Sequence, residues 1–230
     1  VILGEGDSER IVVPRIAEAS GLPLDPSFVP IVPLGGRYAS YFWKLLADLE
    51  IPHATLLDLD LGRKHGGANA IRAAVAALSS VGNDLTGNLD FMLGQIDPAD
   101  LPALEDADLT DGFENPWLKA LRLEGIFFSG PLDLDFSMLA AFPAAYQHAR
   151  PGGHGPWTTP ASIQQKKLTT LKTDGNPDLY DDGYDPKFTW YPYLFLSHSK
   201  PETHLAALGR IDAANLAADA PPELTALIDY

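Results

Sequence analysis

Six acidic side chains occur as three pairs along this sequence, and each pair follows a short, largely apolar segment. In an open parallel sheet, ligands bind beyond the carboxyl ends of the strands, where the connecting loops converge. If the apolar segments are strands of one sheet, all three pairs meet at one edge of it. The pairs are Glu5 with Glu9, Asp58 with Asp60, and Asp133 with Asp135.

Carboxylates gathered in this way would repel one another strongly in a partly dry site unless cations lay between them. Oxygen ligands of this kind suit Mg²⁺ or Mn²⁺. Two such ions about 4 Å apart can activate a water molecule and stabilise the leaving oxygen of a phosphoryl displacement. A single acidic pair is explained equally well by a solvated turn or a helix cap, but three pairs at three strand ends favour a metal site.

The segments that must position these acids alternate between strand and helix patterns. Residues 1–3 are apolar and run into a Gly-Glu-Gly turn, which predicts a strand, and residues 7–20 have a helical pattern that starts at a capping Asp or Ser. Residues 28–34 and 53–57 are further strand candidates, with a helical pattern over 38–49 between them. This alternation predicts an α/β fold with a mainly parallel sheet and right-handed crossovers.

The pattern changes in the middle of the chain. From residue 66 helical periodicity replaces the strand pattern, and an apolar strand candidate returns at 125–129. A later segment is rich in Pro, Gly and aromatic residues and precedes a final strand candidate at 193–196. Long loops of this kind are often functional. The predicted organisation is a main α/β domain over residues 1–65 and 124–230, a helical insertion over 66–123, and an irregular excursion over 146–192 within the main domain.

The composition narrows the classes of protein to consider. Of 230 residues, 46% are hydrophobic, which supplies a core and excludes a fully disordered chain. The absence of cysteine excludes disulfides and thiolate zinc sites. No apolar run could cross a bilayer and no leader pattern is present, so a cytoplasmic protein is expected. Because the chain starts at Val1 rather than Met, we expect it to be a piece of a longer protein.

The formal net charge of −15 argues against a passive nucleic-acid binder, whose affinity depends mainly on Lys and Arg. Two effects weaken this objection. Metal ions bound by acidic residues neutralise or reverse the local charge. A part of the full protein outside this chain could also supply a basic groove.

Several motifs resemble those of a known family. Residues 2–9 (Ile-Leu-Gly-Glu-Gly-Asp-Ser-Glu) are similar to the EGxxE opening of a Toprim domain, and residues 56–60 (Leu-Leu-Asp-Leu-Asp) to its DxD motif. Residues 129–136 and 199–201 resemble segments of the OLD (overcoming lysogenization defect) branch of Toprim nucleases, with class 2 as the better fit. The resemblance implies a Toprim-like, mainly parallel sheet flanked by helices, with an inserted helical subdomain.

The resemblance also implies a function: a bacterial, metal-dependent DNA endonuclease of phage defence that nicks or cuts DNA by two-metal phosphodiester hydrolysis. The expected cofactors are two Mg²⁺ or Mn²⁺ ions. In the ligand set that the resemblance implies, one ion is bound by Glu9, Asp58 and Asp60, and the second by Glu5, Asp133 and Asp135.

The resemblance also implies roles for two further residues. Lys200 would face the negative charge that develops on the phosphate, so Lys200, Glu5 and Asp58 are the expected catalytic residues. Ser129 would be a minor ligand or a group that orients the ligands. A solvated loop lysine and a strand-end hydroxyl are the alternative interpretations of Lys200 and Ser129.

The partners implied by the resemblance are DNA, an N-terminal ATPase domain of the full-length protein, a helicase, and a second copy of the chain that pairs through a part outside this sequence. No Gly-x-x-x-x-Gly-Lys-Ser/Thr phosphate loop occurs in these residues, so no ATP site is expected within them.

Two other functions remain open from the residues alone. An Asp-x-Asp phosphatase could use Asp58 or Asp133 as its nucleophile, but it would leave Glu5 and Glu9 unexplained. A non-catalytic module could bind metal for stability and dock a partner that carries out the chemistry.

Overall fold

One parallel sheet forms the centre of the molecule, whose computed structural model describes residues 1–35, 39–81 and 96–230. Ile2 of the first strand pairs with Ile31 of the second and with Ala54 of the third, and Asp58 pairs with Ser129 of the fourth. The predicted α/β class with a parallel sheet is therefore confirmed. The order is β2-β1-β3-β4, for β1 (Ile2–Gly4), β2 (Ile31–Pro33), β3 (Ala54–Asp58) and β4 (Ile126–Ser129).

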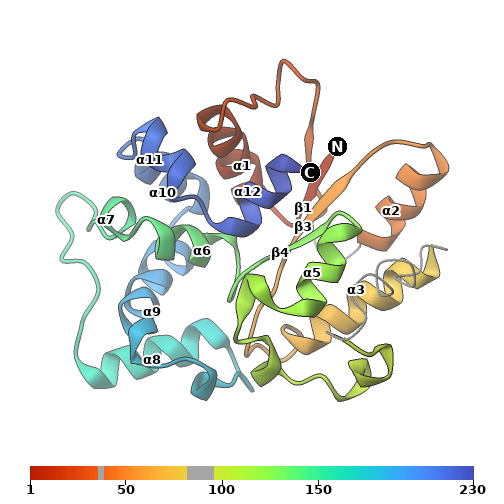
Figure 1. The fold of residues 1–230 in the computed structure, drawn as a ribbon. Helices are drawn as coiled ribbons and strands as arrows, with labels where there is room; N and C mark the ends of the chain where they lie inside the picture. The colour runs from red at the N-terminus through yellow and green to blue at the C-terminus, as the bar shows by residue number, and fades with distance from the viewer. Residues whose placement is uncertain (36–38, 82–95) are drawn as a thin grey trace.

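Helices cover both faces of this sheet, with α2, α3 and α5 on one side and α1, α6 and α12 on the other (Figure 1). Within the described ranges, none of them combines the length and hydrophobicity that crossing a membrane requires. The α-helices are α1 (Asp7–Ala19), α2 (Ala39–Asp48), α3 (Ala68–Ser80), α5 (Pro116–Leu123), α6 (Leu134–Ala141), α7 (Pro143–Tyr146), α8 (Pro160–Leu171), α9 (Asp185–Tyr191), α10 (Lys200–Leu208), α11 (Ala213–Ala218) and α12 (Pro222–Asp229).

The short strands are buried because their side chains alternate between two cores. Leu56 and Phe127 point into the core that also holds Ile16 of α1. Ile126 and Phe128, which flank Phe127, point into the core on the opposite face. Parallel strands covered by helices on both faces carry such continuous apolar runs. This burial fixes the strand register and therefore the places where the strands end.

The structure corrects the sequence prediction in the second half of the chain. The strand predicted at 193–196 is wrong, because Pro192–Leu196 forms a π-helix, η6. A short apolar run does not distinguish a buried strand from a buried helical turn by periodicity. The excursion predicted as irregular over 146–192 contains α8 and α9, whose prolines lie in the first helical turn, where proline is tolerated.

The region predicted as a helical insertion, 66–123, contains α3 and α5 together with short 3₁₀ helices: η1 (Pro98–Ala103), η2 (Asp106–Leu109) and η3 (Gly112–Glu114). Residues 82–95 of that region lie outside the described residues. Two more 3₁₀ helices, η4 (Pro177–Leu179) and η5 (Asp182–Tyr184), lie between α8 and α9.

Replacing Phe136 with alanine should destabilise the protein by about 3–5 kcal/mol, the usual cost of emptying a phenylalanine site in a core. Phe136 is fully buried, and its ring centroid lies 5.2 Å from that of Phe188 and 5.7 Å from that of Tyr191. Urea denaturation measures the loss. The matched control is Phe28→Ala, which removes the same atoms from a 91% exposed site and should change the free energy of unfolding by less than about 0.5 kcal/mol. Equal effects would contradict the assigned core.

A second prediction concerns pH. Burial raises the pKa of Glu223 on α12, whose carboxylate accepts a 2.8 Å hydrogen bond from Ser137 Oγ. A carboxyl group with a raised folded-state pKa binds its proton more tightly in the folded state. The free energy of unfolding should therefore fall as pH rises above the ordinary value of 4.5. Glu223→Gln should reduce this slope and the exposed control Glu50→Gln should leave it unchanged, as measured by urea denaturation from pH 4.5 upward. An unchanged slope in Glu223→Gln would refute the assignment.

Candidate metal centre

The loops that follow β1, β3 and β4 bring the acidic pairs to one edge of the sheet. Glu5 follows β1, Asp58 ends β3, and Asp133 caps the N-terminus of α6 after the loop from β4. Because the strands are parallel, these three ends face the same way. The cavity at this edge has a volume of about 200 Å³, and the charged residues that line it are Glu5, Asp7, Glu9, Asp58, Asp133, Asp135 and Lys200.

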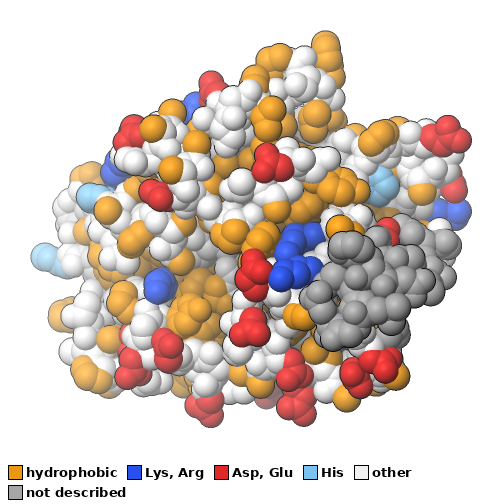
Figure 2. Space-filling view, viewed as in Figure 1, with side chains coloured by type: hydrophobic (Ala, Val, Ile, Leu, Met, Phe, Trp, Pro, Cys, Tyr) orange, Lys and Arg blue, Asp and Glu red, His pale blue; other side chains and the backbone are white. Residues whose placement is uncertain are grey.

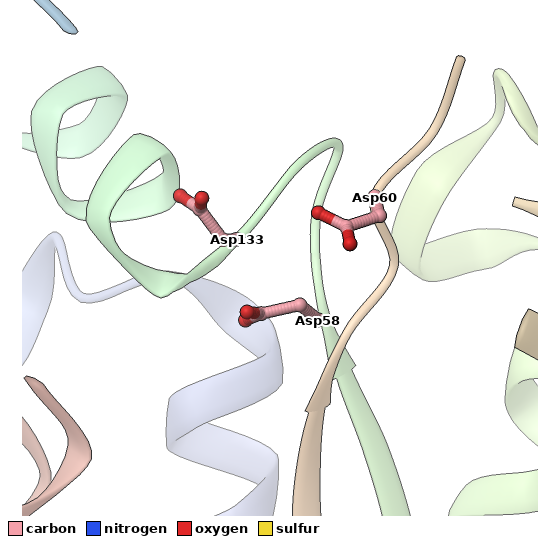
Figure 3. Close-up of side chains that lie close together, drawn as sticks. All are labelled: Asp58, Asp60 and Asp133. Carbon is pink, nitrogen blue, oxygen red and sulfur yellow. The ribbon is translucent and has the colours of Figure 1, made fainter. Parts of the chain in front are cut away.

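Asp58, Asp60 and Asp133 form the tightest acidic group at this edge. One carboxylate oxygen from each lies within 4.8 Å of the others. Figure 3 shows Asp58 and Asp60 on the segment that continues from β3, with their side chains directed toward the side on which Asp133 lies. Three carboxylates at this separation are close enough to bind one cation together.

Backbone amides hold the two glutamates that follow β1. The Glu9 carboxylate accepts hydrogen bonds from Gly6 N at 3.0 Å and from Glu5 N at 3.2 Å. Burial raises the pKa of Glu9 despite these bonds. Gly4 makes the arrangement possible, because a Cβ at this position would lie 2.8 Å from Glu9 Cβ. Glu5 Oε1 in turn accepts from Asp58 N at 3.0 Å, which ties β1 to the end of β3.

Asp58 lies at the centre of the group. Its Oδ1 accepts a 3.0 Å hydrogen bond from Ser129 Oγ across the β3–β4 pair. Burial, followed by the nearby Asp133 and Glu5 carboxylates, holds the pKa of Asp58 well above its ordinary value. The predicted Ser129 therefore contacts an expected ligand, and Asp58 is a carboxylate that a nearby cation would stabilise in its charged form.

A guanidinium that the sequence reasoning missed lies beside the other two aspartates. Arg63, with a 10% exposed side chain, forms an ion pair with Asp60 and a second, 3.5 Å pair with Asp133. Tyr191 of α9 also donates a hydrogen bond to Asp133 Oδ2. Burial, followed by Asp135, raises the pKa of Asp133, and Arg63 opposes that rise.

The loop after β3 folds back tightly, which is why Arg63 reaches Asp60. Asp60 has a positive φ of 54°, and Arg63 N donates to Asp60 O at 2.9 Å. Gly66 is required here, because a Cβ at this position would lie 2.0 Å from Asp60 O. The cue in the sequence is an arginine three residues after the second aspartate, between glycines, a spacing that a search for carboxylates alone overlooks.

Asp135, the last of the six acids, makes a different set of contacts. Its Oδ1 accepts from Ser8 Oγ at 2.7 Å and lies 2.8 Å from His204 Nε2, and its Oδ2 lies 2.5 Å from Lys200 Nζ. Burial opposes ionisation of Asp135, but the contacts with His204 and Lys200 outweigh it and lower its pKa to about 2. Lys200 thus lines the cavity, whereas Ser8 and His204 were missed by the sequence reasoning.

Lys200 has a raised pKa for a related reason. Burial lowers it, but the Asp135 and Asp133 carboxylates outweigh burial, so the ammonium stays charged at neutral pH. In the described part of the chain, Arg63 forms ion pairs with Asp60 and Asp133, and Lys200 forms one with Asp135. Backbone N–H groups and hydroxyls also donate hydrogen bonds to Glu5, Glu9 and Asp58.

This donor set fits a hard divalent cation. The ligand atoms are carboxylate oxygens, the kind that Mg²⁺ and Mn²⁺ bind, and neither thiolate nor clustered histidine is present among the described residues of the cavity. The raised pKa of Asp58 indicates that positive charge near this carboxylate would stabilise its ionised form. The three-carboxylate cluster is therefore consistent with divalent metal binding.

Comparisons with known proteins identify a family for the first part of the chain. Residues 1–60 match the model of the family described as "Overcoming lysogenization defect protein-like, TOPRIM domain". The matched segment contains four of the six acids, from Glu5 to Asp60. No match was found among curated protein sequences.

Several solved structures resemble the whole chain, among them C-terminal regions of OLD proteins from two bacteria. The C-terminal region of the Burkholderia pseudomallei OLD protein has a TM-score of 0.55 at 17% identity, covering 100% of this chain and 94% of that one. The C-terminal region of the Xanthomonas campestris pv. campestris OLD protein has a TM-score of 0.53 at 18% identity, covering 99% and 91%. At such identities these likenesses establish the fold. The predicted resemblance is thereby confirmed: residues 1–60 match the OLD-like Toprim family, and the chain as a whole has the fold of OLD C-terminal regions.

Proposed function

We propose that this chain is the catalytic part of a metal-dependent DNA nuclease that hydrolyses phosphodiester bonds. One observation carries the proposal. Acidic side chains from three strand ends, far apart in sequence, converge with Lys200 on a single cavity. The family match of residues 1–60 and the fold of OLD C-terminal regions support the same function.

In this proposal Asp58, Asp60 and Asp133 hold one divalent ion, and Glu5 and Glu9 hold a second together with Asp58. The grouping of Asp133 with Asp58 and Asp60 follows the 4.8 Å cluster and differs from the ligand division expected from the sequence. Bound Mg²⁺ or Mn²⁺ ions would supply an activated water and stabilise the leaving oxygen of the phosphodiester.

The protein's own groups then have separate roles. Lys200, whose side chain is 44% exposed, lines the cavity, and its ammonium contacts the phosphate and stabilises its developing negative charge. Ser129 holds the Asp58 carboxylate in place through its 3.0 Å hydrogen bond. Arg63 holds Asp60 and Asp133 on adjacent loops, so that the site is already formed before a cation enters.

The binding of DNA must overcome the negative charge of this chain. On the face in Figure 2, acidic side chains are spread over the lower edge and the basic ones form no continuous surface. The proposal therefore assigns DNA affinity to the bound ions and to an N-terminal ATPase domain of the longer protein, with a helicase as a further partner of a class 2 enzyme.

One observation favours a second candidate. Arg63 already neutralises part of the acidic group, as expected of a non-catalytic module in which metal serves stability. Such a module binds Mn²⁺ but cleaves nothing, even in the full-length protein. A phosphatase using Asp58 or Asp133 as a nucleophile would give a trappable aspartyl phosphate, and it has no use for the Glu5 and Glu9 carboxylates.

Asp58→Asn should lower the rate of plasmid cleavage in Mg²⁺ or Mn²⁺ by at least about 100-fold, since even groups that only orient metal ligands are worth 10–100-fold. The change keeps the size of the side chain but removes the charge at the centre of the cluster. Agarose-gel assays of supercoiled DNA measure both nicking and double-strand cutting.

The matched control is Asp48→Asn, which makes the same chemical change at an exposed residue of α2 paired with Lys44. It should leave cleavage unchanged. Circular dichroism must show that both variants fold. Full cleavage by folded Asp58→Asn and by Glu5→Gln would rule out the nuclease proposal.

Arg63→Ala should destabilise the metal-free protein by about 3–5 kcal/mol, because it leaves two largely buried carboxylates without their cation. Mn²⁺ should then restore more stability to the variant than it adds to the wild type, since the ion replaces the missing positive charge. Urea denaturation with EDTA and with Mn²⁺ measures both effects.

The control here is Arg15→Ala, which breaks a surface pair with Glu18 and should cost less than about 1 kcal/mol with no change in the Mn²⁺ effect. A wild-type-like response of Arg63→Ala to Mn²⁺ would show that the ion and Arg63 do not share ligands.

A further inference from the structure

Helix α10 contacts one buried carboxylate through two side chains. Lys200 and His204 are four residues apart, so they lie on the same face of the helix, one turn from each other. Both reach Asp135, but at different oxygens: Lys200 Nζ lies 2.5 Å from Oδ2, and His204 Nε2 lies 2.8 Å from Oδ1. Each carboxylate oxygen of Asp135 therefore contacts a different side chain of α10.

The remaining contacts of Asp135 leave it little freedom. Its side chain is 2% exposed, and Ser8 Oγ donates a second hydrogen bond to Oδ1 at 2.7 Å. A carboxylate only accepts hydrogen bonds, so His204 Nε2 carries the proton and donates it to Oδ1. Oδ1 therefore has two donors, and Oδ2 faces the Lys200 ammonium.

The His204 ring is itself fixed on its far side. His204 is fully buried, and its Nδ1 lies 2.7 Å from the hydroxyl of Tyr146. This distance is that of a hydrogen bond, so the ring is held at both nitrogens. The rings of Tyr146 and Phe195 pack against the imidazole, with centroids 5.6 and 5.3 Å away. The result is a chain of contacts from Tyr146 through His204 and Asp135 to Lys200.

We propose that His204 is a positioning residue that acts through Asp135: with Tyr146 behind it, His204 fixes Asp135, and Asp135 holds the Lys200 ammonium at the rim of the acidic cavity. Asp135 then anchors Lys200 instead of ligating a metal ion as expected from the sequence. This assignment rests on the proposed function, in which Lys200 contacts the phosphate. In this assignment His204 affects catalysis although it contacts neither the metal ions nor the DNA.

The geometry explains why such an anchor is needed. The Lys200 side chain is long and 44% exposed, and a lysine in that environment loses considerable rotamer freedom when it is held in one place. Asp58 and Asp133 line the same cavity and would attract the ammonium into the proposed metal site. A fixed partner at Asp135 keeps the ammonium at the rim and leaves those carboxylates to cations.

The test compares His204→Leu, which removes the donor, with His204→Gln, whose amide N–H can replace it. Tyr146→Phe keeps the ring but removes the hydroxyl, and it serves as a second variant should His204→Leu fail to fold. His148→Leu, at an exposed histidine, is the matched control. Three experiments are carried out on the full-length protein. NMR records the ¹⁵N–¹H signal of the Lys200 ammonium, calorimetry gives the Mn²⁺ affinity, and a cleavage assay gives kcat and KM for DNA.

In the wild type, the held Lys200 ammonium should give a resolved signal that His204→Leu loses and His204→Gln retains. His204→Leu should lower kcat by about 10–100-fold, as expected for the loss of an orienting partner, with Mn²⁺ affinity and KM unchanged. Combined with Lys200→Ala, it should cause no further loss, because both changes remove one function. Tyr146→Phe should give a smaller effect in the same direction.

An unchanged Lys200 signal and unchanged kcat in His204→Leu would overturn the proposal. So would an equal loss of kcat in the Lys200→Ala background, which would indicate a purely structural role. Weakened Mn²⁺ binding with an intact Lys200 signal would overturn it by making Asp135 a metal ligand. If no form of the protein cleaves DNA while the Lys200 signal depends on His204 as predicted, the nuclease proposal fails and the positioning of Lys200 by His204 stands.

Discussion

The mutual repulsion of carboxylates at one edge of the sheet is the constraint on which the rest of this structure depends. Several of the acids at the cavity accept hydrogen bonds from backbone N–H groups of the protein. Glu9 accepts from the amides of Glu5 and Gly6, Glu5 accepts from the amide of Asp58, and Asp133 accepts from the amide of Phe136. Hydrogen bonds to the charged form lower the cost of ionisation. The loops at the strand ends are shaped by the need to supply these amides.

Among the described residues, two cations form ion pairs with different parts of the acidic group. Arg63, from the loop after β3, neutralises Asp60 and Asp133, whereas Lys200, from α10, neutralises Asp135. Asp58 lies between these two groups and has a pKa well above its ordinary value because of burial and its neighbours Asp133 and Glu5. Positive charge near Asp58 would therefore stabilise its ionised form. A divalent ion would supply that charge at ligands of the type it prefers.

Much of the sheet and of the acidic edge was predictable because local patterns determine them. Strand-length apolar runs end at Glu5, Asp58 and Ser129, and parallel pairing then brings the acids together. The contacts of Arg63, His204 and Ser8 were not predictable in this way. The pairs of Ser8 and His204 with Asp135 and of Arg63 with Asp133 depend on long-range packing, over 127, 69 and 70 residues. Only the pair of Arg63 with Asp60 is local, three residues apart. No periodicity within one segment encodes the long-range pairs.

The mispredicted segments failed for related reasons. The richness of residues 146–192 in Pro, Gly and aromatic residues predicts an irregular excursion, although Pro160 and Pro186 stand in first helical turns, where the missing N–H costs nothing. The run at 193–196 was read as a strand from its apolar character alone, and it is the π-helix η6 that leads into α10. These errors lie in the half of the chain that delivers Tyr191, Lys200 and His204 to the acids. The acidic candidates for metal ligands were therefore easier to predict from the sequence than the groups that contact them.

The most direct test of the central claim is the anomalous diffraction of Mn²⁺ in crystals of this protein. The account predicts Mn²⁺ peaks inside the cavity at the carboxyl ends of β1, β3 and β4, bonded to Asp58 and its neighbouring carboxylates. Anomalous density absent from that cavity, with Asp58 contacting protein groups alone at saturating Mn²⁺, would contradict it.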